Sequence, residues 1–431
     1  MKTNHIRVGK KAIVLTHILI ILLVWPVCSF ADKYSGGDGS AEHPYKIATP
    51  NDLNDIGNHP EDLDKYFELV NDINLAAYTG TEFKMVGDRY NDFNGIFDGN
   101  GYTIYNFSWV SSNIDEDYIG LFGRLESNGK IRNLNLENVD INVSDNSNFI
   151  GGLVGFNYFG SIFNCSSSGS VKGVSHVGGL VGFNDGTISC CHSSCVVYES
   201  SSLISSFSGG LVGTNYFGTI TSSYATGNVF GTESVGGLVG VNINEIIYSY
   251  SKGDINGTSN IGGLVGENRY RIIESYTAGK VTGNQAFGGL VGKSGLWSTI
   301  RKSFWNIDVN PDMNGIGNGS DPNVIGKTTA EMQTESTFTN AGWDFVGETI
   351  NGPNDIWTIK EGVKYPEHVW KLVNFVGWDG VDFRDYDYFA GWWMETDCND
   401  VNDCNGVDLD FSNMVDYNDL DIFCNYWLVG K

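Results

Sequence analysis

The stretch IGGLVGFNYFG, residues 150–160, contains the pattern that decides the fold of this chain. Its core, GGLVG, begins at Gly151 and returns five times downstream, at Gly178, Gly209, Gly236, Gly262 and Gly288. The starting points are 27, 31, 27, 26 and 26 residues apart, and IGLFG at 119–123 is a degenerate earlier copy. A period of roughly 20 to 50 residues indicates a solenoid, a propeller or an array of small units.

Other positions recur with the motif and divide each period into short segments. An Asn follows the motif in five copies and a Ser in the sixth, at Asn157, Asn184, Asn215, Asn242, Asn268 and Ser294. Next come an Ile column and a column of small residues, Ile162, Ile188, Ile220, Ile246, Ile272 and Ile300, then Cys165, Cys191, Ser223, Ser249, Ser275 and Ser303. Aromatic residues follow four of the small ones, at Tyr224, Tyr250, Tyr276 and Phe304. Each period therefore reads as three short β segments separated by Gly, Asn and Ser turns.

These segments predict a mainly β fold in which coils of about 26 residues stack on one another. Three strands in so short a period leave no room for a crossover helix, and a propeller blade needs about 40 residues. Neighbouring coils would pair as parallel strands ~4.8 Å apart. Stacking would place Asn residues in an amide ladder and Tyr residues in a ring stack. We therefore predict a parallel β-helix or a closely related β-solenoid.

The Leu-Val pair of the motif leaves one structural question open. A regular strand points neighbouring side chains, such as Leu153 and Val154, to opposite faces. Either the preceding glycines bend the chain or one of the two columns faces outward. An outward column would form an exposed apolar stripe, where a partner would be sought first.

The N-terminal residues predict export from the cell. Four basic residues precede an apolar run from about 12 to 27, and the small-x-small sequence Ser29-Phe30-Ala31 follows it, as in a secretory signal peptide. The run is shorter than the roughly 20 residues that a membrane span needs, so we expect no transmembrane segment after cleavage. Without residues 1–31 the chain has 51 acidic and 22 basic residues, a formal charge of −29. Such a chain repels nucleic acid and anionic membranes, and we expect it to be secreted, extracellular or at the cell surface.

The repeats resemble the GLUG motif, which is found in large secreted or surface bacterial proteins, including some adhesins and some immunoglobulin-cleaving proteases. The resemblance covers about residues 119–306 and implies no chemistry, because the repeat has no established activity of its own. Upstream, FNGIFDGNGYTI (93–104) and IRNLNLENVDINV (131–143) resemble early coils of pectin-lyase-like right-handed β-helices. Residues 34–57 resemble the segment that often precedes such coils and caps their open end.

Signals of catalysis are weak. No HExxH sequence is present, so a zinc protease has no support. β-Helical enzymes that cleave polysaccharides gather carboxylates or basic residues on one outer face, whereas Asp and Glu form no column here. Asp98 stands in DGNG, a turn composition, and Cys191 and His192 would face opposite ways on a strand. An enzyme, as a polysaccharide lyase or glycoside hydrolase, stays open only through irregular loops such as 111–118 and 307–326.

The cysteines allow two disulfides without proving either. Cys165 and Cys191 share a column in consecutive coils, where the Cα separation would fall within the disulfide range. Cys398 and Cys404 could staple the linker between two C-terminal helices. Removal of the signal peptide leaves seven cysteines, so at least one stays free or pairs outside the chain.

The last sixty residues carry the metal chemistry that the sequence predicts. VDFRDYDYFAGWW (381–393) and VDYNDLDIFCNYW (415–427) are a duplication at an offset of 34. Each has apolar residues at helical spacing, Phe383, Tyr386, Phe389 and Trp393 in the first copy and Tyr417, Leu420, Phe423 and Trp427 in the second. Ahead of the second copy, DLDFSNMVDYND (408–419) has the oxygen pattern of a twelve-residue calcium loop. The predicted calcium ligands are Asp408, Asp410, Ser412, the Met414 carbonyl, Asp416 and Asp419. Asn413 takes the usual glycine slot, which Asn tolerates because it enters left-handed conformations more easily than most residues.

This tail resembles a dockerin of type I, a pair of calcium-loop-plus-helix units at the C-terminus of a secreted protein. The resemblance implies calcium as the cofactor and a cohesin-like or other surface protein as the partner. It also favours a polysaccharide context, because dockerins mostly accompany polysaccharide hydrolases. The first copy departs from the pattern, since Asn374, Val376 and Trp378 stand at positions 1, 3 and 5 and only Asp382 and Asp385 remain. Its calcium site is therefore expected to be dead, which puts cohesin binding in doubt.

The chain thus divides into a signal peptide (1–31), an N-terminal cap with the first β-helix coils (32–118), the GLUG-repeat solenoid (119–306), a C-terminal cap with helical character around 330–338 (307–371), and a dockerin-like domain (372–431). We expect no catalytic residues and no organic cofactor. The favoured function is a non-catalytic binding or adhesion protein that presents its solenoid to glycans or proteins and attaches through its tail. The alternative is a polysaccharide-degrading enzyme on a β-helix scaffold.

Overall fold

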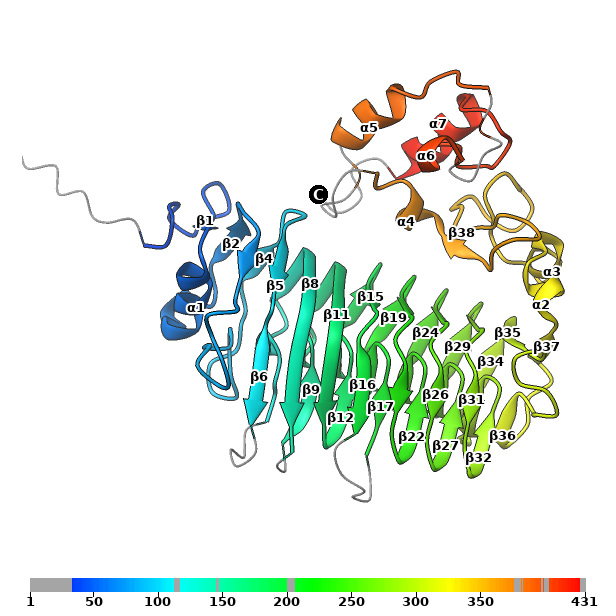
Figure 1. The fold of residues 1–431 in the computed structure, drawn as a ribbon, viewed down its shortest axis with the longest axis horizontal. Helices are drawn as coiled ribbons and strands as arrows, with labels where there is room; N and C mark the ends of the chain where they lie inside the picture. Colours follow the sequence, from blue (N-terminus) through cyan, green and yellow to red (C-terminus); the bar gives the residue numbers. More distant parts are fainter. Residues whose placement is uncertain are drawn as a thin grey trace, which may run out of the picture.

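The described strands between residues 45 and 327 form a solenoid of parallel strands in the computed structural model (Figure 1). The structure describes residues 33–111, 117–144, 147–199, 206–375, 381, 383–396, 398 and 403–426. The predicted signal peptide lies outside these residues, as does most of loop 111–118. Along the solenoid, each coil pairs with the next in parallel register. The prediction of a parallel β-solenoid is therefore confirmed.

Two of the sheets contain the repeated motif. In the described chain, the first has eight strands: β7 (Phe122–Leu125), β10 (Val154–Asn157), β13 (Val181–Asn184), β18 (Val212–Asn215), β23 (Val239–Asn242), β28 (Val265–Asn268), β33 (Val291–Ser294) and β36 (Ile316–Asn318). The second has six: β9 (Asn148–Gly151), β12 (Ser175–Gly178), β17 (Ser208–Gly209), β22 (Glu233–Gly236), β27 (Ser259–Gly262) and β32 (Gln285–Gly288).

A third, long sheet holds the other solenoid strands. Its N-terminal members are β1 (Tyr45–Ile47), β2 (Tyr66–Leu69), β3 (Ile73–Asn74), β4 (Ile96–Asp98), β5 (Thr103–Tyr105), β6 (Ser108–Ser111), β8 (Lys130–Val143) and β11 (Ser161–Gly173). The middle coils add β14 (Thr187–Ser189), β15 (His192–Ser193), β16 (Val196–Glu199), β19 (Thr219–Thr221), β20 (Tyr224–Ala225), β21 (Val229–Phe230), β24 (Glu245–Ile247), β25 (Tyr250–Ser251) and β26 (Ile255–Asn256). The last coils add β29 (Arg271–Ile273), β30 (Tyr276–Thr277), β31 (Val281–Thr282), β34 (Thr299–Arg301), β35 (Ser303–Asn306) and β37 (Val324–Lys327).

Both apolar residues of each GGLVG copy face the interior. All six Leu and all six Val residues are fully buried in the core, Leu153, Leu180, Leu211, Leu238, Leu264 and Leu290, with Val154, Val181, Val212, Val239, Val265 and Val291. The chain turns a corner between β9 and β10, where Leu153 N and Val154 N both donate to the same carbonyl, Leu180 O, at 2.9 and 3.1 Å. The glycine pair thus bends the chain, and the outward apolar stripe is not formed.

Polar ladders line the coils as the repeat predicts. The Asn157 side-chain amide donates to Asn184 Oδ1 at 2.7 Å, and the ladder continues through Asn215, Asn242 and Asn268 with separations of 2.8 Å. The small-residue column forms a second ladder, in which each backbone N–H donates to the side chain of the next coil, from Cys165 to Ser303. Buried amides and hydroxyls are thereby satisfied, which removes the main cost of a polar interior.

The cysteines of that second ladder are free thiols. Cys165 N donates to Cys191 Sγ at 3.4 Å, so the thiol takes the role that a serine hydroxyl has in the later coils. The cross-coil disulfide that the shared column allows is therefore absent from the structure.

The N-terminal end of the solenoid is covered by the helix α1 (Pro50–Asn58) and a short 3₁₀ turn (Pro60–Asp62). Thr49 caps the helix by accepting from Asp52 N, and Pro50 stands in the first turn, where a missing N–H costs nothing. Leu53 and Ile56 are buried in the same core as the first coils. This segment closes the apolar end that a solenoid would otherwise expose.

After the last coil the chain runs back along the side of the solenoid (Figure 1). This segment contains α2 (Thr329–Met332), α3 (Glu335–Thr339), the antiparallel pair β38 (Trp357–Thr358) and β39 (Glu367–His368), and α4 (Val369–Leu372). The helical character expected around 330–338 is confirmed. His368 Nε2 lies 2.6 Å from Tyr248 O, and Trp370 Nε1 donates to Ser222 O at 3.0 Å. The segment therefore covers a lateral face of the coils rather than only their end.

The face that it covers is the predicted aromatic column. The rings of Tyr224, Tyr250 and Tyr276 stack with centroids 4.8 and 5.0 Å apart, which confirms the predicted ring stack. Trp343 and Trp357 pack on these rings in one buried cluster. The Tyr column points away from the interior of the coils, and together with the returning segment it forms a second hydrophobic core.

The C-terminal residues form a small helical unit. Its helices are α5 (Phe383–Ala390), α6 (Asp403–Gly406) and α7 (Tyr417–Asn425). Val369 and Val373 at α4 share a core with Phe389 of α5 and Phe423 of α7. Figure 1 shows the tail helices next to α4, and this shared core explains the position.

Candidate functional site

Three carboxylates meet in the predicted calcium loop. Asp408, Asp410 and Asp419 each place one oxygen within 4.8 Å of the others, and Asp408 and Asp419 are buried. The loop brings them together because Asp419 lies in the first turn of α7 while Asp408 and Asp410 begin the segment that leads to this helix. Oxygen ligands grouped in this way are the donor set that calcium prefers.

Backbone N–H groups hold the three carboxylates in place. Asp419 Oδ1 accepts from Leu409 N at 2.6 Å, and Asp408 Oδ2 accepts from Asn413 N at 2.9 Å. Asn413 itself has a φ of 71°, the left-handed conformation expected of the glycine slot. The tight turn at Asn413 lets the loop wrap around its own acidic side chains.

The other three predicted ligands, Ser412, Met414 and Asp416, take part in hydrogen bonds within the loop. Ser412 Oγ donates to the Met414 carbonyl at 3.2 Å, so these two oxygens contact each other. Asp416 caps α7, because its Oδ1 accepts from Asn418 N at 2.8 Å. The structure thus groups Asp408, Asp410 and Asp419, whereas Ser412, Met414 and Asp416 take part in local hydrogen bonds of the same loop.

The carboxylates have unusual proton affinities. Burial, together with the neighbouring charge of Asp419, raises the pKa of Asp408 to about 7. Burial and the charge of Asp410 raise the pKa of Asp419 to about 6. Among the described residues, neither carboxylate forms an ion pair with Lys or Arg. A cation bound between the three groups would relieve both their repulsion and the cost of their burial.

Lowering the pH is expected to stabilise the metal-free tail. The folded pKa values of Asp408 and Asp419 lie above the unfolded value of about 3.9, so the folded state binds protons more tightly. This stabilisation is complete below about pH 4 and is lost as the pH rises through 6 and 7. Thermal melts in EDTA between pH 4 and 8 measure it. The double variant Asp408→Asn/Asp419→Asn should flatten the pH profile, and a wild-type melting temperature that rises with pH would contradict the prediction.

The first copy of the duplication is only partly described. Val376, Trp378 and Asp382 lie outside the described residues, so its predicted lack of calcium remains a prediction. Asp385 is fully buried in α5. Cys398 and Cys404 form a disulfide with a Cα separation of 4.8 Å, which confirms the predicted staple between the two helices.

The two tail helices do not bury their whole apolar stripes. Phe389 and Phe423, equivalent residues of the two copies, pack against each other with ring centroids 5.2 Å apart. Phe383 and Tyr417, the first residues of the two stripes, are each 75% exposed. The predicted stripes are therefore core at the middle of each helix and surface at its beginning.

The tail is fastened to the lateral segment by polar contacts as well as by the shared core. Tyr426 Oη donates to the Asp355 carbonyl at 2.5 Å, and Asn425 Nδ2 donates to Asp355 Oδ2 at 3.1 Å. Lys360 forms an ion pair with Asp403. Sequence reasoning missed this docking because the partners are far apart in the chain.

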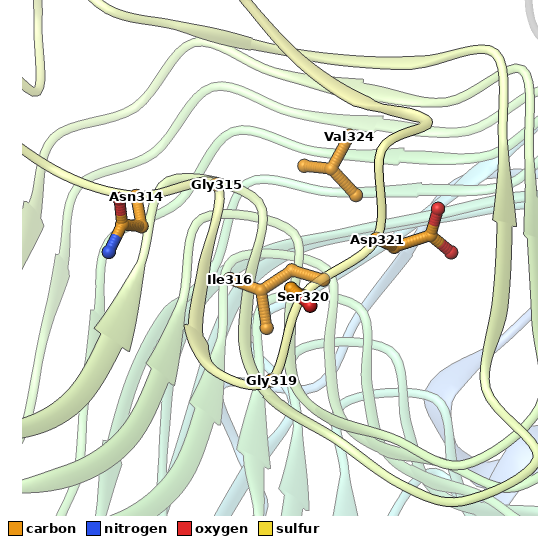
Figure 2. A pocket seen from close by; sticks show the side chains of 7 residues that line it. All are labelled: Asn314, Gly315, Ile316, Gly319, Ser320, Asp321 and Val324. Carbon is orange, nitrogen blue, oxygen red and sulfur yellow. The ribbon is translucent and has the colours of Figure 1, made fainter.

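Loop 307–326, one of the two loops in which the sequence left an enzyme site possible, contains a hollow at the end of the solenoid. The hollow has a volume of about 250 Å³. Figure 2 shows the residues that line it, 314–316, 319–321 and 324. Its single carboxylate, Asp321, accepts from Asn323 N at 2.9 Å and Ile300 N at 3.3 Å, which ties down the turn. General acid–base cleavage of a glycosidic bond needs two carboxyl groups, so this hollow lacks the required pair.

A second hollow, of about 390 Å³, lies on the first coils and is charged. Lys46, Glu68, Asp98 and Arg132 occupy one column of β1, β2, β4 and β8. Lys46 pairs with Glu68, and Arg132 Nε donates to Asp98 Oδ2 at 2.7 Å. Asp98 also accepts from Asn100 N at 2.9 Å, which confirms its turn role and adds an ion pair that the sequence did not indicate.

The comparison with families supports the assignment of the repeats. The family described as "The GLUG motif" matches residues 147–172 and 208–229. The chain is therefore a β-solenoid protein that carries GLUG motifs. Within the described residues, no helix is long and apolar enough to cross a bilayer.

Two relatives share about a third of the chain. Over 146 residues it is 37% identical to the "Putative Gly-rich membrane protein" of Evansella cellulosilytica, a match of 33% of this chain and 17% of that protein. Over 155 residues it is 36% identical to "Halomucin" of Haloquadratum walsbyi, a match of 34% of this chain and 2% of that protein. The chain thus spans less than a fifth of the length of either relative.

Two solved structures are similar at low identity. A crystal structure of a "putative immunoglobulin A1 protease" from Bacteroides ovatus has a TM-score of 0.49 and 20% identity, covering 78% of this chain and 95% of that one. A structure named "IgA1 Protease" has a TM-score of 0.48 and 18% identity, covering 77% of this chain and 27% of that one.

Proposed function

We propose that this chain is an exported, non-catalytic binding or adhesion protein. Its solenoid presents a long surface to glycans or proteins, and its dockerin-like tail binds calcium and attaches to a cohesin-like or other surface protein. The group of Asp408, Asp410 and Asp419 supports this proposal most directly. Two buried carboxylates beside a third are costly without a cation, and a loop that gathers them is best explained by a calcium role.

The exposed aromatic residues of the tail support the docking role. Phe383 and Tyr417 occupy equivalent positions of the duplicated helices and are both largely exposed. Large apolar side chains on an otherwise acidic surface are typical anchors of protein interfaces. The two helices therefore offer a pair of related anchors to a partner, while their buried residues hold the tail together.

The alternative, a polysaccharide-degrading enzyme, has one observation in its favour. Glu68 and Asp98 lie on neighbouring strands in the charged hollow of the first coils. Both already pair with a cation, Lys46 and Arg132. Each carboxylate is therefore engaged in an ion pair within the column, and acting on a substrate would require breaking that pair. The hollow is therefore better suited to structure or binding than to cleavage.

A polysaccharide panel separates the binder from the enzyme. The purified chain should be retained by a polysaccharide column without releasing new reducing or unsaturated ends. Release of such ends, lost in the variant Asp98→Asn and kept in Asp321→Asn, would establish the enzyme and overturn the proposal. The second variant is a matched control, because Asp321 is a carboxylate in the other hollow.

A further inference from the structure

A row of exposed aromatic rings runs along one corner of the solenoid. The corner is the turn that follows the Asn ladder, between the eight-stranded sheet and the long sheet. The rings come from the coils that begin at Gly151, Gly209, Gly262 and Gly288. We call this row the aromatic ridge, and its members are Phe159, Phe217, Tyr270 and Trp297, whose exposed fractions are 47%, 59%, 42% and 79%.

The turns that carry these rings are rigid. Tyr216 N donates to Asn184 O at 2.9 Å, and Arg269 N donates to Asn242 O at 2.7 Å, so the turns continue the parallel ladder. At Gly218 a Cβ would lie 2.0 Å from Asn184 Nδ2, which presses the turn against the amide ladder. The rings therefore project from a fixed scaffold rather than from a loose loop.

Three of the four ridge residues alternate along the axis, whereas Trp297 stands in the coil directly after that of Tyr270. Phe159, Phe217 and Tyr270 lie two coils apart, a spacing of ~9.6 Å in each step. The coils between them place Asp185 and Asn244 at the same corner. Asn244 Nδ2 donates to Phe217 O at 2.6 Å, and Asp185 Oδ1 accepts from Phe217 N at 3.2 Å. The polar residues of the intervening coils thus hold the Phe217 turn in place, and Asp185 is itself buried.

This alternation fits an extended glycan. In a β-1,4-linked chain, successive pyranose rings face opposite ways, so the same face returns every second sugar. That two-sugar repeat is comparable with the two-coil spacing of the ridge. The face of an aromatic ring is electron-rich and attracts the positively polarised C–H groups of a pyranose face. A chain laid along the axis would then place every second sugar on the next ring in the series Phe159, Phe217 and Tyr270.

The charges near the ridge disfavour an anionic occupant. Arg269 pairs with Glu267 at 2.8 Å, and Arg271 pairs with Glu245 at 2.7 Å, so the cations beside the ridge are compensated. The whole chain carries a formal charge of −25. An anionic glycan or a second copy of the chain would be repelled, whereas a neutral glycan would not.

We propose that the aromatic ridge binds a neutral, extended β-1,4-linked polysaccharide along the axis of the solenoid. The inference rests on the proposed binding function and specifies its surface and its ligand class.

Titration with cellohexaose and chitohexaose tests the proposal. Calorimetry on the full chain should show binding of one or both, with a change in the fluorescence of the exposed Trp297. Loss of two rings in Phe217→Ala/Tyr270→Ala should weaken binding by ~10-fold or more, because each substitution removes an apolar platform for a sugar face. Phe217→Tyr keeps the ring and should keep the affinity. Tyr90→Ala, which removes an aromatic residue that is 80% exposed elsewhere, should bind as the wild type does.

Three results would overturn the proposal that the ridge binds a glycan. The first is equal affinity in the wild type and the double variant. The second is equal binding of dextran or polygalacturonate, which lack the neutral β-1,4 repeat. The third is a dimer of the wild type that the double variant abolishes, which would assign the ridge to a second copy. If the double variant binds glycan as well as the wild type does, the ridge is not the binding surface, but the proposed binding function stands. If the wild type itself retains no glycan, the glycan part of the proposed function and the ridge proposal are both wrong.

Discussion

The variant Gly236→Ala is expected to lower the free energy of unfolding by roughly 3 kcal/mol or more, the largest stability effect that we predict for a single methyl group. The glycine opens the fourth GGLVG copy. A Cβ at this position would lie 2.0 Å from Val239 O, in the corner of the same coil, and 2.7 Å from Gly266 N, in the next coil. Backbone atoms cannot move aside without breaking the parallel ladder. Because each coil supports its neighbours, the damage should spread beyond one repeat.

Urea unfolding of the full chain measures this effect, and Gly295→Ala is the matched control. A Cβ at Gly295 would lie no closer than 3.3 Å to any neighbouring atom, so this variant should unfold within about 0.5 kcal/mol of the wild type. Neither glycine has a positive φ, and the comparison therefore separates crowding at the coil corner and against the next coil from backbone strain. Equal midpoints for the two variants would contradict the stacking argument.

The variants Asp408→Ala and Asp419→Ala are expected to weaken calcium binding more than ~100-fold, because each removes a first ligand of the proposed site. In the wild type, calcium at 100 times its dissociation constant should add about 2.7 kcal/mol to the stability of the tail. Isothermal titration and calcium-dependent melting measure the two quantities. Both expected results follow from the proposal that the tail binds calcium.

Two further variants make the calcium prediction specific. Asp421→Ala removes an exposed carboxylate of the same helix, α7, and should leave the affinity within about threefold. Asp410→Asn keeps the size of a ligand but removes its charge, so it should weaken binding even if the loop stays folded. Equal affinity in the wild type, Asp408→Ala and Asp419→Ala would exclude calcium binding at this site.

The repeat predicted much of the solenoid before any contact was known. Identical residues in successive coils must stack when the period is constant, so the Asn ladder and the Tyr stack followed from the columns alone. The Leu-Val pair could not be settled in that way. The period shows that Leu153 and Val154 recur but not where the chain bends between them, and the corner buries both.

The surroundings of the Tyr column were outside the reach of the sequence. Tyr276 Oη donates to Pro366 O at 2.5 Å, a contact between residues 90 apart. Neither the composition nor the period indicates that Trp343 and Trp357 should cover that column. Which residues cover the Tyr column depends on the path of the chain after its last coil, and packing sets that path.

The tail shows the same division between local and distant effects. Local spacing was sufficient to find Asp408, Asp410 and Asp419, because a twelve-residue loop returns its own ligands to one point. Spacing also predicted two helical stripes. It could not show that Phe389 and Phe423 form the core while Phe383 and Tyr417 remain on the surface. Which part of a stripe is buried depends on the partner helix and its crossing.

By itself, the sequence determined the solenoid, its columns of Ile and Asn, and the acidic loop, because each follows from a period or from a short spacing. It allowed the Cys398–Cys404 disulfide as one of two pairings, and the structure contains that one. Only the tertiary structure decided which aromatic surfaces stay open. The Tyr column is covered by a segment that returns along the coils, while the aromatic ridge at another corner stays exposed. The Tyr column recurs in consecutive copies of the repeat and the ridge residues do not, yet neither pattern indicates which rings are covered. Burial is settled by what the rest of the chain packs against, and that packing joins residues that no local pattern connects.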